Sequence, residues 1–318
     1  MSSAELLTAN LLSPVVLAFV LGMVARLLRS DLEIPSAIQS YLSIFLLLAI
    51  GLKGGVALSQ SSDGLRLAGL VSITVVIGVL SAMVAYAAAR WWLRDNRTEA
   101  AAMAAHYGSV SAVTFIAAQQ YVERAGMPSE GVLVALVVAM EIPAILFGLM
   151  VGKGSGIHWA QVREVLTGKT AILLLGGLAI GALAGRQRIQ SVDAMYFQLF
   201  QGTLMLFMLD MGMVAAKQLR NLGADAARLV PYSIVIPLVH GCVGAWMGGR
   251  MGLGVGSAAV FGTMVASASY IAAPASIRAS LPDANVGRCL TAALGITFPF
   301  NLAVGIPLYA HIAQLTQS

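Results

Sequence analysis

Ten apolar stretches divide the 318-residue chain, and each is long enough to cross a lipid bilayer. They are 11–28, 36–58, 65–93, 98–122, 130–151, 169–187, 193–219, 226–250, 254–279 and 285–314. Only 10% of the residues are charged, against about 25% in a soluble domain. Such a chain cannot cover a globule with a hydrated surface. We therefore predict an all-α membrane protein with ten transmembrane helices, which excludes an ordinary soluble enzyme.

The Lys and Arg residues predict how the chain is oriented in the membrane. Of 19 such residues, 13 lie in the loops after odd-numbered stretches or at the adjoining helix ends, and 5 lie on the opposite side. The positive-inside rule then places the odd loops in the cytoplasm and both termini outside a bacterial inner (plasma) membrane. These residues form no patch, so nucleic acid is not an expected partner. The remaining one, Lys53, is close enough to the outer end of its stretch to extend to the membrane surface.

The two halves of the sequence match each other at an offset of about 158 residues. Gly108-Ser109-Val110-Ser111 corresponds to Ala266-Ser267-Ala268-Ser269, and Pro143 corresponds to Pro299. A repeat of five spans must be inverted, because an odd number of crossings reverses the second copy. We therefore predict a first repeat at 1–151, a cytoplasmic linker with a short amphipathic helix at 152–168, and a second, inverted repeat at 169–318. Secondary transporters use this architecture.

The matching motifs in stretches 4 and 9 predict a binding site. Both motifs are small and polar, which favours helices that break and cross at the midplane of the membrane. The N–H groups and Ser hydroxyls at a helix start attract an anion, while the Ser111 and Thr114 hydroxyls can hold sodium. The competing interpretation is close helix packing through small residues. The two motifs together contain eight residues, Gly108, Ser109, Val110, Ser111, Ala266, Ser267, Ala268 and Ser269.

Ionisable residues inside the stretches are further candidates, because a charge is costly there. Glu141 lies midway along the fifth stretch. It can support a cation or take a proton, or it can make a structural hydrogen bond to a broken helix. We expect Asp210 to pair with a basic residue, and His106 and His240 to pack with a local hydrogen bond.

Several motifs carry a resemblance to a known family. They are Ile50-Gly51-Leu52-Lys53-Gly54-Gly55, Gly108-Ser109-Val110-Ser111 with Thr114, Met140-Glu141-Ile142-Pro143-Ala144, Met211-Gly212-Met213, Pro237-Leu238-Val239-His240-Gly241, and Ile277-Arg278 followed by Pro282-x-Ala284-Asn285. In these motifs the chain resembles the sodium-dependent bicarbonate transporters of cyanobacterial carbon concentration. The resemblance implies a gate domain from spans 1, 2, 6 and 7 and a core domain from spans 3–5 and 8–10. It also implies a homotrimer and a bicarbonate site between the broken spans.

When the family's site is carried over by position, the resemblance implies that bicarbonate binds the eight residues of the motifs 108–111 and 266–269. It implies that Thr114 and the Glu141 region help to bind sodium. Ser111 and Ser269 occupy matching positions, where a hydroxyl can serve either ion. The chain departs from the family pattern at Tyr270, where the family has an acid, and at Glu141, where it has Asp. The loop 152–168 is shorter than that of the family, and a PII-like regulator is a possible partner on this face.

The expected function is sodium-coupled bicarbonate uptake by an elevator-like motion of the core against the gate. No cofactor is expected besides sodium as the coupling ion, and no bound metal site. A second interpretation keeps the fold but changes the substrate to another small carboxylate, or the coupling ion to a proton. A third is a membrane-embedded sensor or scaffold without transport.

Overall fold

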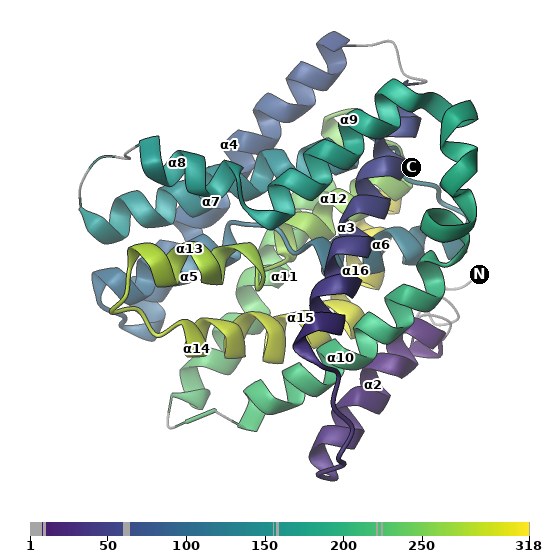
Figure 1. Ribbon diagram of the computed structural model, residues 1–318. Coiled ribbons are helices and arrows are strands. Elements are labelled where there is room, and N and C mark those ends of the chain that lie inside the picture. The colour runs from purple at the N-terminus through teal and green to yellow at the C-terminus, as the bar shows by residue number, and fades with distance from the viewer. Residues whose placement is uncertain are drawn as a thin grey trace.

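The computed structural model describes residues 8, 11–59, 64–154, 156, 159–220, 222–223 and 225–317, and this part of the chain contains helices and no strand (Figure 1). The helices of the first half are α2 (Pro14–Leu27), α3 (Ser36–Ser59), α4 (Gly64–Ala88), η1 (Ala89–Leu93), α5 (Arg97–Tyr107), α6 (Ala112–Arg124), α7 (Leu133–Lys153) and α8 (Trp159–Leu166). Those of the second half are α9 (Lys169–Ile189), η2 (Gln190–Val192), η3 (Ala194–Gln198), α10 (Phe200–Arg220), α11 (Ala226–Arg250), α12 (Val255–Ala266), α13 (Ala272–Ser280), α14 (Val286–Leu290), η4 (Thr291–Thr297), α15 (Phe298–Phe300), η5 (Asn301–Gly305) and α16 (Ile306–Leu315).

Seven helical segments of the described chain are long and apolar enough to cross a membrane. They are Ser36–Ser59, Gly64–Leu93, Arg97–Arg124, Leu133–Lys153, Lys169–Val192, Ala226–Arg250 and Val286–Leu315. The other three predicted stretches hold helix α2, which has 14 residues, the charged helix α10, and the interrupted pair α12 and α13. The prediction of ten spans therefore stays a prediction for these three.

Helix α4 has the surface expected of a helix in contact with lipid. Only 33% of the residues in the most apolar 18-residue segment of Gly64–Leu93 are buried. The side chains of Ile73, Val76, Leu80 and Val84 are exposed along this helix. A monomeric protein in water rarely exposes so large a continuous apolar face. The helix is apolar all round, as membrane helices are.

Glycines join four of the helices into two tightly packed pairs, α3 with α9 and α2 with α10 (Figure 1). A Cβ atom added to Gly55 of α3 would lie 2.1 Å from the Leu178 carbonyl oxygen of α9. A Cβ atom added to Gly22 of α2 would lie 2.0 Å from the Leu209 carbonyl oxygen of α10. The backbones therefore touch, as in other membrane helix pairs built on small residues.

The remaining long helices pack into a second body. Helices α4, α5 and α7 pack on one another, and so do α11, α12 and α16. The two sets meet where α12 contacts α4 and α7 and where α11 contacts α4. Helix α6 packs on α12, and α13 packs on α5. We call α2, α3, α9 and α10 the gate helices, and α4–α7 with α11–α16 the core helices, after the domains that the resemblance implies.

The linker helix and the irregular last helix both agree with local features of the sequence. The expected short helix in the linker is confirmed as α8, and Gly154 precedes it with a φ of 68° that ends α7 in the left-handed conformation. The last predicted stretch is continuous but irregular, because the π-helical segments η4 and η5 flank Pro299. Proline lacks the N–H that an α-helix needs at this point.

Candidate functional site

The first helix break separates α5, which ends at Tyr107, from α6, which begins at Ala112. Ser111 starts α6 because its extended backbone (φ −95°, ψ 115°) lets its Oγ accept a hydrogen bond from the Thr114 N–H at 3.2 Å. Gly108 fits beside α4 only because it lacks a side chain, since a Cβ would lie 2.5–2.8 Å from atoms of Ala82. The break lies where the sequence predicted it.

The second break separates α12, which ends at Ala266, from α13, which begins at Ala272. Ser267 donates its hydroxyl hydrogen to the Met264 carbonyl at 2.7 Å. The Oγ of Ser269 accepts a hydrogen bond from the Ala273 N–H at 3.2 Å. Pro274 fits the first turn of α13 because an N–H there would have no partner within the helix. This break also confirms the prediction from the sequence.

Two backbone donors connect the breaks directly. The Ser111 N–H donates to the Ser267 Oγ at 2.8 Å, and the Ser269 N–H donates to the His106 carbonyl at 2.8 Å. The matching motifs are 156 residues apart at the first of these contacts, yet they meet in the fold. The starts of α6 and α13 therefore belong to one buried region.

This region keeps free donors although it is buried. Each of the seven motif residues from Ser109 to Ser111 and from Ala266 to Ser269 is at most 3% exposed. Among the described atoms, the Ser109 hydroxyl has no hydrogen-bond partner. The Ala112 and Val113 N–H groups at the start of α6 also have no acceptor in the described part of the chain, as expected for a helix N-terminus. Such donors suit an anion.

Thr114 and Glu141 are buried as well, with 1% and 3% of their surface exposed. Thr114 lies one turn into α6, beside the Ser111 hydroxyl that accepts its N–H. Glu141 lies on α7, which packs on α5 and contacts α12 and α13. Its carboxylate makes no hydrogen bond with any described residue. The structural hydrogen bond to a broken helix, one of the expected roles, therefore does not occur in this structure.

Tyr270, the departure from the family pattern, is 8% exposed and lies directly after Ser269. Its ring packs edge-on against Phe298 of α15, with ring centroids 5.7 Å apart. Its hydroxyl makes no regular hydrogen bond with a described atom, but it lies close enough to the Ser111 side chain to interact with it. A bulky ring therefore occupies space beside the second break.

Asn301, which was not predicted as a site residue, supports the second break. Its Nδ2 donates to the Ala266 carbonyl at 3.0 Å, at the end of α12. The Tyr309 hydroxyl lies 3.0 Å from the Pro237 carbonyl oxygen and 3.2 Å from the Asn301 Oδ1, and it can donate its one hydrogen to either. The available signal for this role was a single Asn within an otherwise apolar stretch.

Three expectations about isolated polar residues have different outcomes. Asp210 accepts a hydrogen bond from the Gln39 amide at 2.9 Å, so the expected basic partner was wrong. His106 makes the expected local contact, with its Nδ1 2.7 Å from the Ala102 carbonyl oxygen. His240 has no hydrogen-bond partner on either ring nitrogen among the described atoms, so its expected local hydrogen bond was wrong.

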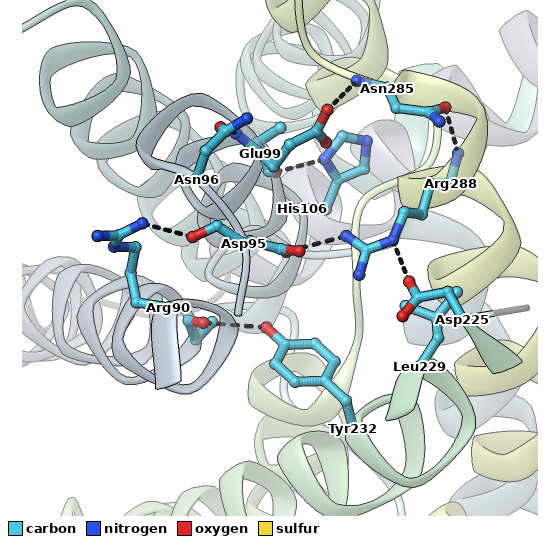
Figure 2. A network of polar contacts seen from close by, with 12 residues as sticks. Arg90, Asp95, Asn96, Glu99, His106, Asp225, Leu229, Tyr232, Asn285 and Arg288 are labelled. Atoms are coloured by element: carbon cyan, nitrogen blue, oxygen red, sulfur yellow. Dashed lines mark hydrogen bonds and ion pairs between the residues drawn. The ribbon is translucent and has the colours of Figure 1, made fainter. Parts of the chain in front are cut away.

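A polar network connects three loops of the core helices at the side where α5 begins (Figure 2). Arg288 of α14 lies between two acids and donates to Asp95 at 2.9 Å and to Asp225 at 2.6 Å. The Asn285 N–H donates to Glu99 at 3.0 Å. Burial raises the pKa of the Asp95 carboxyl above its ordinary value, although the hydrogen bond and charge of Arg288 lower it. Asp225 precedes α11, so this network anchors the end of the connection from α10 to the core.

Replacing Arg288 with Gln is expected to destabilise the protein by about 1–3 kcal/mol at neutral pH, because the buried Asp95 carboxylate would lose its charged hydrogen-bond donor. Loss of the guanidinium raises the pKa of Asp95 further. Protonation then relieves the unpaired charge, so the loss of stability should shrink as the pH falls from 7 to 5. The measurement is the melting temperature of both proteins in detergent across this range. A difference that is constant with pH would contradict the ionic role of the pair.

A family model supports the resemblance over nearly the whole chain. The model of the Na+-dependent bicarbonate transporter superfamily matches residues 14–314, a range that includes both helix breaks and Glu141. Among curated proteins, none matches this sequence. The family transports ions across membranes, in agreement with seven apolar helices of membrane-spanning length. The chain therefore belongs to the Na+-dependent bicarbonate transporter superfamily and is a multi-pass membrane protein.

Proposed function

We propose that this protein takes up bicarbonate together with sodium across the inner membrane, and that both ions bind at the paired helix breaks. The observation that carries the proposal is the direct contact between two breaks from opposite halves of the chain, at Ser111 with Ser267 and at Ser269 with His106. Breaks of this kind expose backbone groups inside a membrane protein, where they are tolerated next to a binding site.

Bicarbonate is the expected anion for this region. The N–H groups of Ala112 and Val113 and the Ser109 hydroxyl offer donors, and the start of α6 carries a partial positive charge. A small planar anion with one charge matches a site that contains no fixed cation among these donors. The ring of Tyr270 beside Ser269 leaves little room for a larger carboxylate.

Sodium is expected next to the anion, held by the hydroxyls of Ser111, Thr114 and Ser269 and by the Glu141 region. Hydroxyl, carbonyl and carboxylate oxygens are the ligands that hard cations prefer. Glu141 is a buried acid of α7, three residues before Ala144, and Ala144 packs with Ala104 of α5 close to the first break. An anion and a cation bound together cost less to bury than either alone, which supports coupled transport.

We further propose ten spans in two inverted repeats, 1–151 and 169–318, whose broken fourth and ninth helices cross at the midplane. The two glycine pairs support this equivalence. Adding 159 to Gly22 gives Gly181, and adding 157 to Gly55 gives Gly212. Gly55 packs on Gly181 in one pair, and Gly22 packs beside Gly212 in the other. An elevator-like motion would move the core helices, with the breaks, against the gate helices.

With both termini outside, a reporter that is active only in the cytoplasm should give no signal when fused after Ser318. The same reporter inserted in the linker at Gly156 should be active, because this loop is rich in neighbouring basic residues. The measurement is reporter activity normalised to the amount of protein in the membrane. Reporter activity at the C-terminus without activity at Gly156 would mean that the orientation is the opposite of the proposed one.

The proposed function is tested by uptake of labelled bicarbonate into proteoliposomes, with either a sodium gradient or a pH gradient imposed. Accumulation driven by the sodium gradient is the expected result. Accumulation driven by the pH gradient alone would favour proton coupling. Strong competition by acetate or formate would favour another carboxylate as the substrate, and no flux under any gradient would favour a sensor or scaffold.

The serines at the breaks provide the next prediction. Replacing Ser111 and Ser269 with Ala should each reduce uptake at least about tenfold, because each hydroxyl serves the ions as well as its helix start. The lost caps should cost only about 1 kcal/mol each in stability. Ser72→Ala is the matched control, since the Ser72 hydroxyl bonds only to the Ala68 carbonyl on an exposed face of α4. Wild-type uptake by the double variant would refute this assignment.

A further inference from the structure

A polar cavity of about 180 Å³ lies between the gate and core helices, apart from the helix breaks. The gate contributes Lys53 from α3 and Phe200 from α10, and the core contributes Gln119, Gln120 and Glu123 from α6. Gln120 lies nine residues after Ser111 along the helix, which is about 13 Å at 1.5 Å per residue. The cavity is therefore a place distinct from the break region.

The ammonium group of Lys53 is the unusual feature of this cavity. Its Nζ lies 4.0 Å from the centre of the Phe200 ring and 5.5 Å from that of Phe197. It makes no hydrogen bond and no ion pair with any described residue, and the charges of Glu123 and Asp193 act on it only through space. The sequence suggested that Lys53 reaches the membrane surface, but its amine instead lies over these rings at the cavity.

The aromatic contact leaves the hydrogen-bonding capacity of Lys53 unused. A ring face attracts a cation without accepting its N–H groups in good hydrogen bonds, and an ammonium carries three donors. The Gln119 amide adds further donors nearby, although one of them points to the Ser129 Oγ at 3.5 Å. The cavity thus offers a cation and amide donors at one place.

The size of the cavity suits a small hydrated anion. One water occupies about 30 Å³ in the liquid, so the cavity can hold an ion of four heavy atoms with a few waters. Gln120 of α6, which lines the cavity, accepts a hydrogen bond at its Oε1 from the Gln201 amide of the gate helix α10. The cavity therefore lies where a gate helix and a core helix meet, and a motion of core against gate would change it.

The cavity lies at the ends of its helices, where an ion from outside the membrane could enter the protein. Lys53 and Glu123 lie near the C-terminal ends of α3 and α6, and Phe200 is the first residue of α10. In the proposed orientation all three helix ends lie on the outer side of the membrane. An anion that enters from outside would meet this cavity before it reaches the breaks.

We propose that the cavity is an entry site for the transported oxyanion, and that Lys53 binds this anion on its way to the helix breaks. The inference rests on the proposed function and on the outward orientation of this end. A cation at the entrance raises the local concentration of an anion and speeds its arrival. Its loss should therefore weaken apparent affinity and leave the turnover of the bound ions nearly unchanged.

The test is bicarbonate uptake by proteoliposomes measured against external bicarbonate at a fixed, saturating sodium concentration. Lys53→Gln should raise the KM roughly threefold to tenfold and change the maximal rate less than about twofold. Lys53→Arg should restore most of the affinity, because it restores the charge. Increasing ionic strength should raise the KM of the wild type more than that of Lys53→Gln, since salt screens the attraction.

Two further variants separate this role from the alternatives. Glu123→Gln should lower the KM or leave it unchanged, because it removes an acid from the cavity. Lys169→Gln is the matched control, a gate lysine at the start of α9 whose amine lies 3.3 Å from the Ser40 hydroxyl, and it should behave as the wild type.

If Lys53→Gln and Glu123→Gln reduced uptake equally, and the double variant Lys53→Glu/Glu123→Lys restored it, the two residues would form an ion pair that closes the gate. That result would overturn the entry site. An unchanged KM in Lys53→Gln, with normal uptake by the wild type, would overturn the entry site alone. Absence of bicarbonate uptake by the wild type would overturn the proposed function and the entry site together.

Discussion

Replacing Glu141 with Gln is expected to abolish the sodium dependence of bicarbonate uptake and to reduce the rate at least about a hundredfold. Gln keeps the size of the side chain but loses its charge. In an interior with weak screening, a carboxylate at about 4 Å attracts a cation by up to several kcal/mol, and each 1.4 kcal/mol is tenfold in affinity. Glu141 is 3% exposed, and no hydrogen bond from a described residue already uses its charge.

The measurement is uptake against sodium concentration, with the amount of folded protein determined for each variant. Tyr270→Asp is the informative counterpart, because it places an acid directly after Ser269, where the resemblance implies one. We expect it to lower the sodium concentration needed for half-maximal uptake. Unchanged sodium dependence in both variants would make Glu141 structural and would remove it from the site.

Replacing Gly181 or Gly212 with Leu is expected to prevent stable folding. A Cβ on Gly181 would lie 2.4 Å from the Leu52 carbonyl oxygen, and one on Gly212 would lie 2.0 Å from the Phe19 carbonyl oxygen. The helices of each pair would have to separate along their whole contact. Overpacking by a few methylene groups alone costs about 1–3 kcal/mol. The cost should be larger here, because the added side chain would meet backbone atoms, which cannot move aside by changing rotamer.

Each helix supplies its own control for this prediction. Gly176 of α9 and Gly202 of α10 have no atom within 4 Å of an added Cβ, so Gly176→Leu and Gly202→Leu should fold normally. The measurement is the yield of monodisperse protein in mild detergent and its melting temperature. Equal yields from all four variants would mean that the helix pairs are not in contact as described.

The ends of most helices could be predicted from the sequence because the signals for them are local. The stretch 169–187 became helix α9 at Lys169–Ile189, and the stretch 226–250 became α11 at Ala226–Arg250. The breaks were also predictable, since Gly108 and Ser111 at one break and Ser269 and Pro274 at the other favour the end or the start of a helix. Apolar length and cap chemistry decide these features within a few residues.

The polar partners could not be predicted, because they come from distant parts of the chain. Asp210 meets Gln39, which is 171 residues away, and Asn301 meets Ala266 through the packing of separate helices. Lys53 lies over Phe200 for the same reason. Sequence periodicity assigns a residue to a helix, but which residue of another helix it faces depends on how the helices pack.

The most direct test of the central claim, that one site couples the two ions, is the reverse of the uptake experiment. Radioactive sodium is supplied at equal concentration on both sides of the proteoliposome membrane, and an inward bicarbonate gradient is imposed at constant pH. Because coupling is reciprocal, the wild type should accumulate sodium inside, while empty liposomes and the Ser111→Ala/Ser269→Ala double variant should not. Bicarbonate entry through the wild type without any accumulation of sodium would contradict the account.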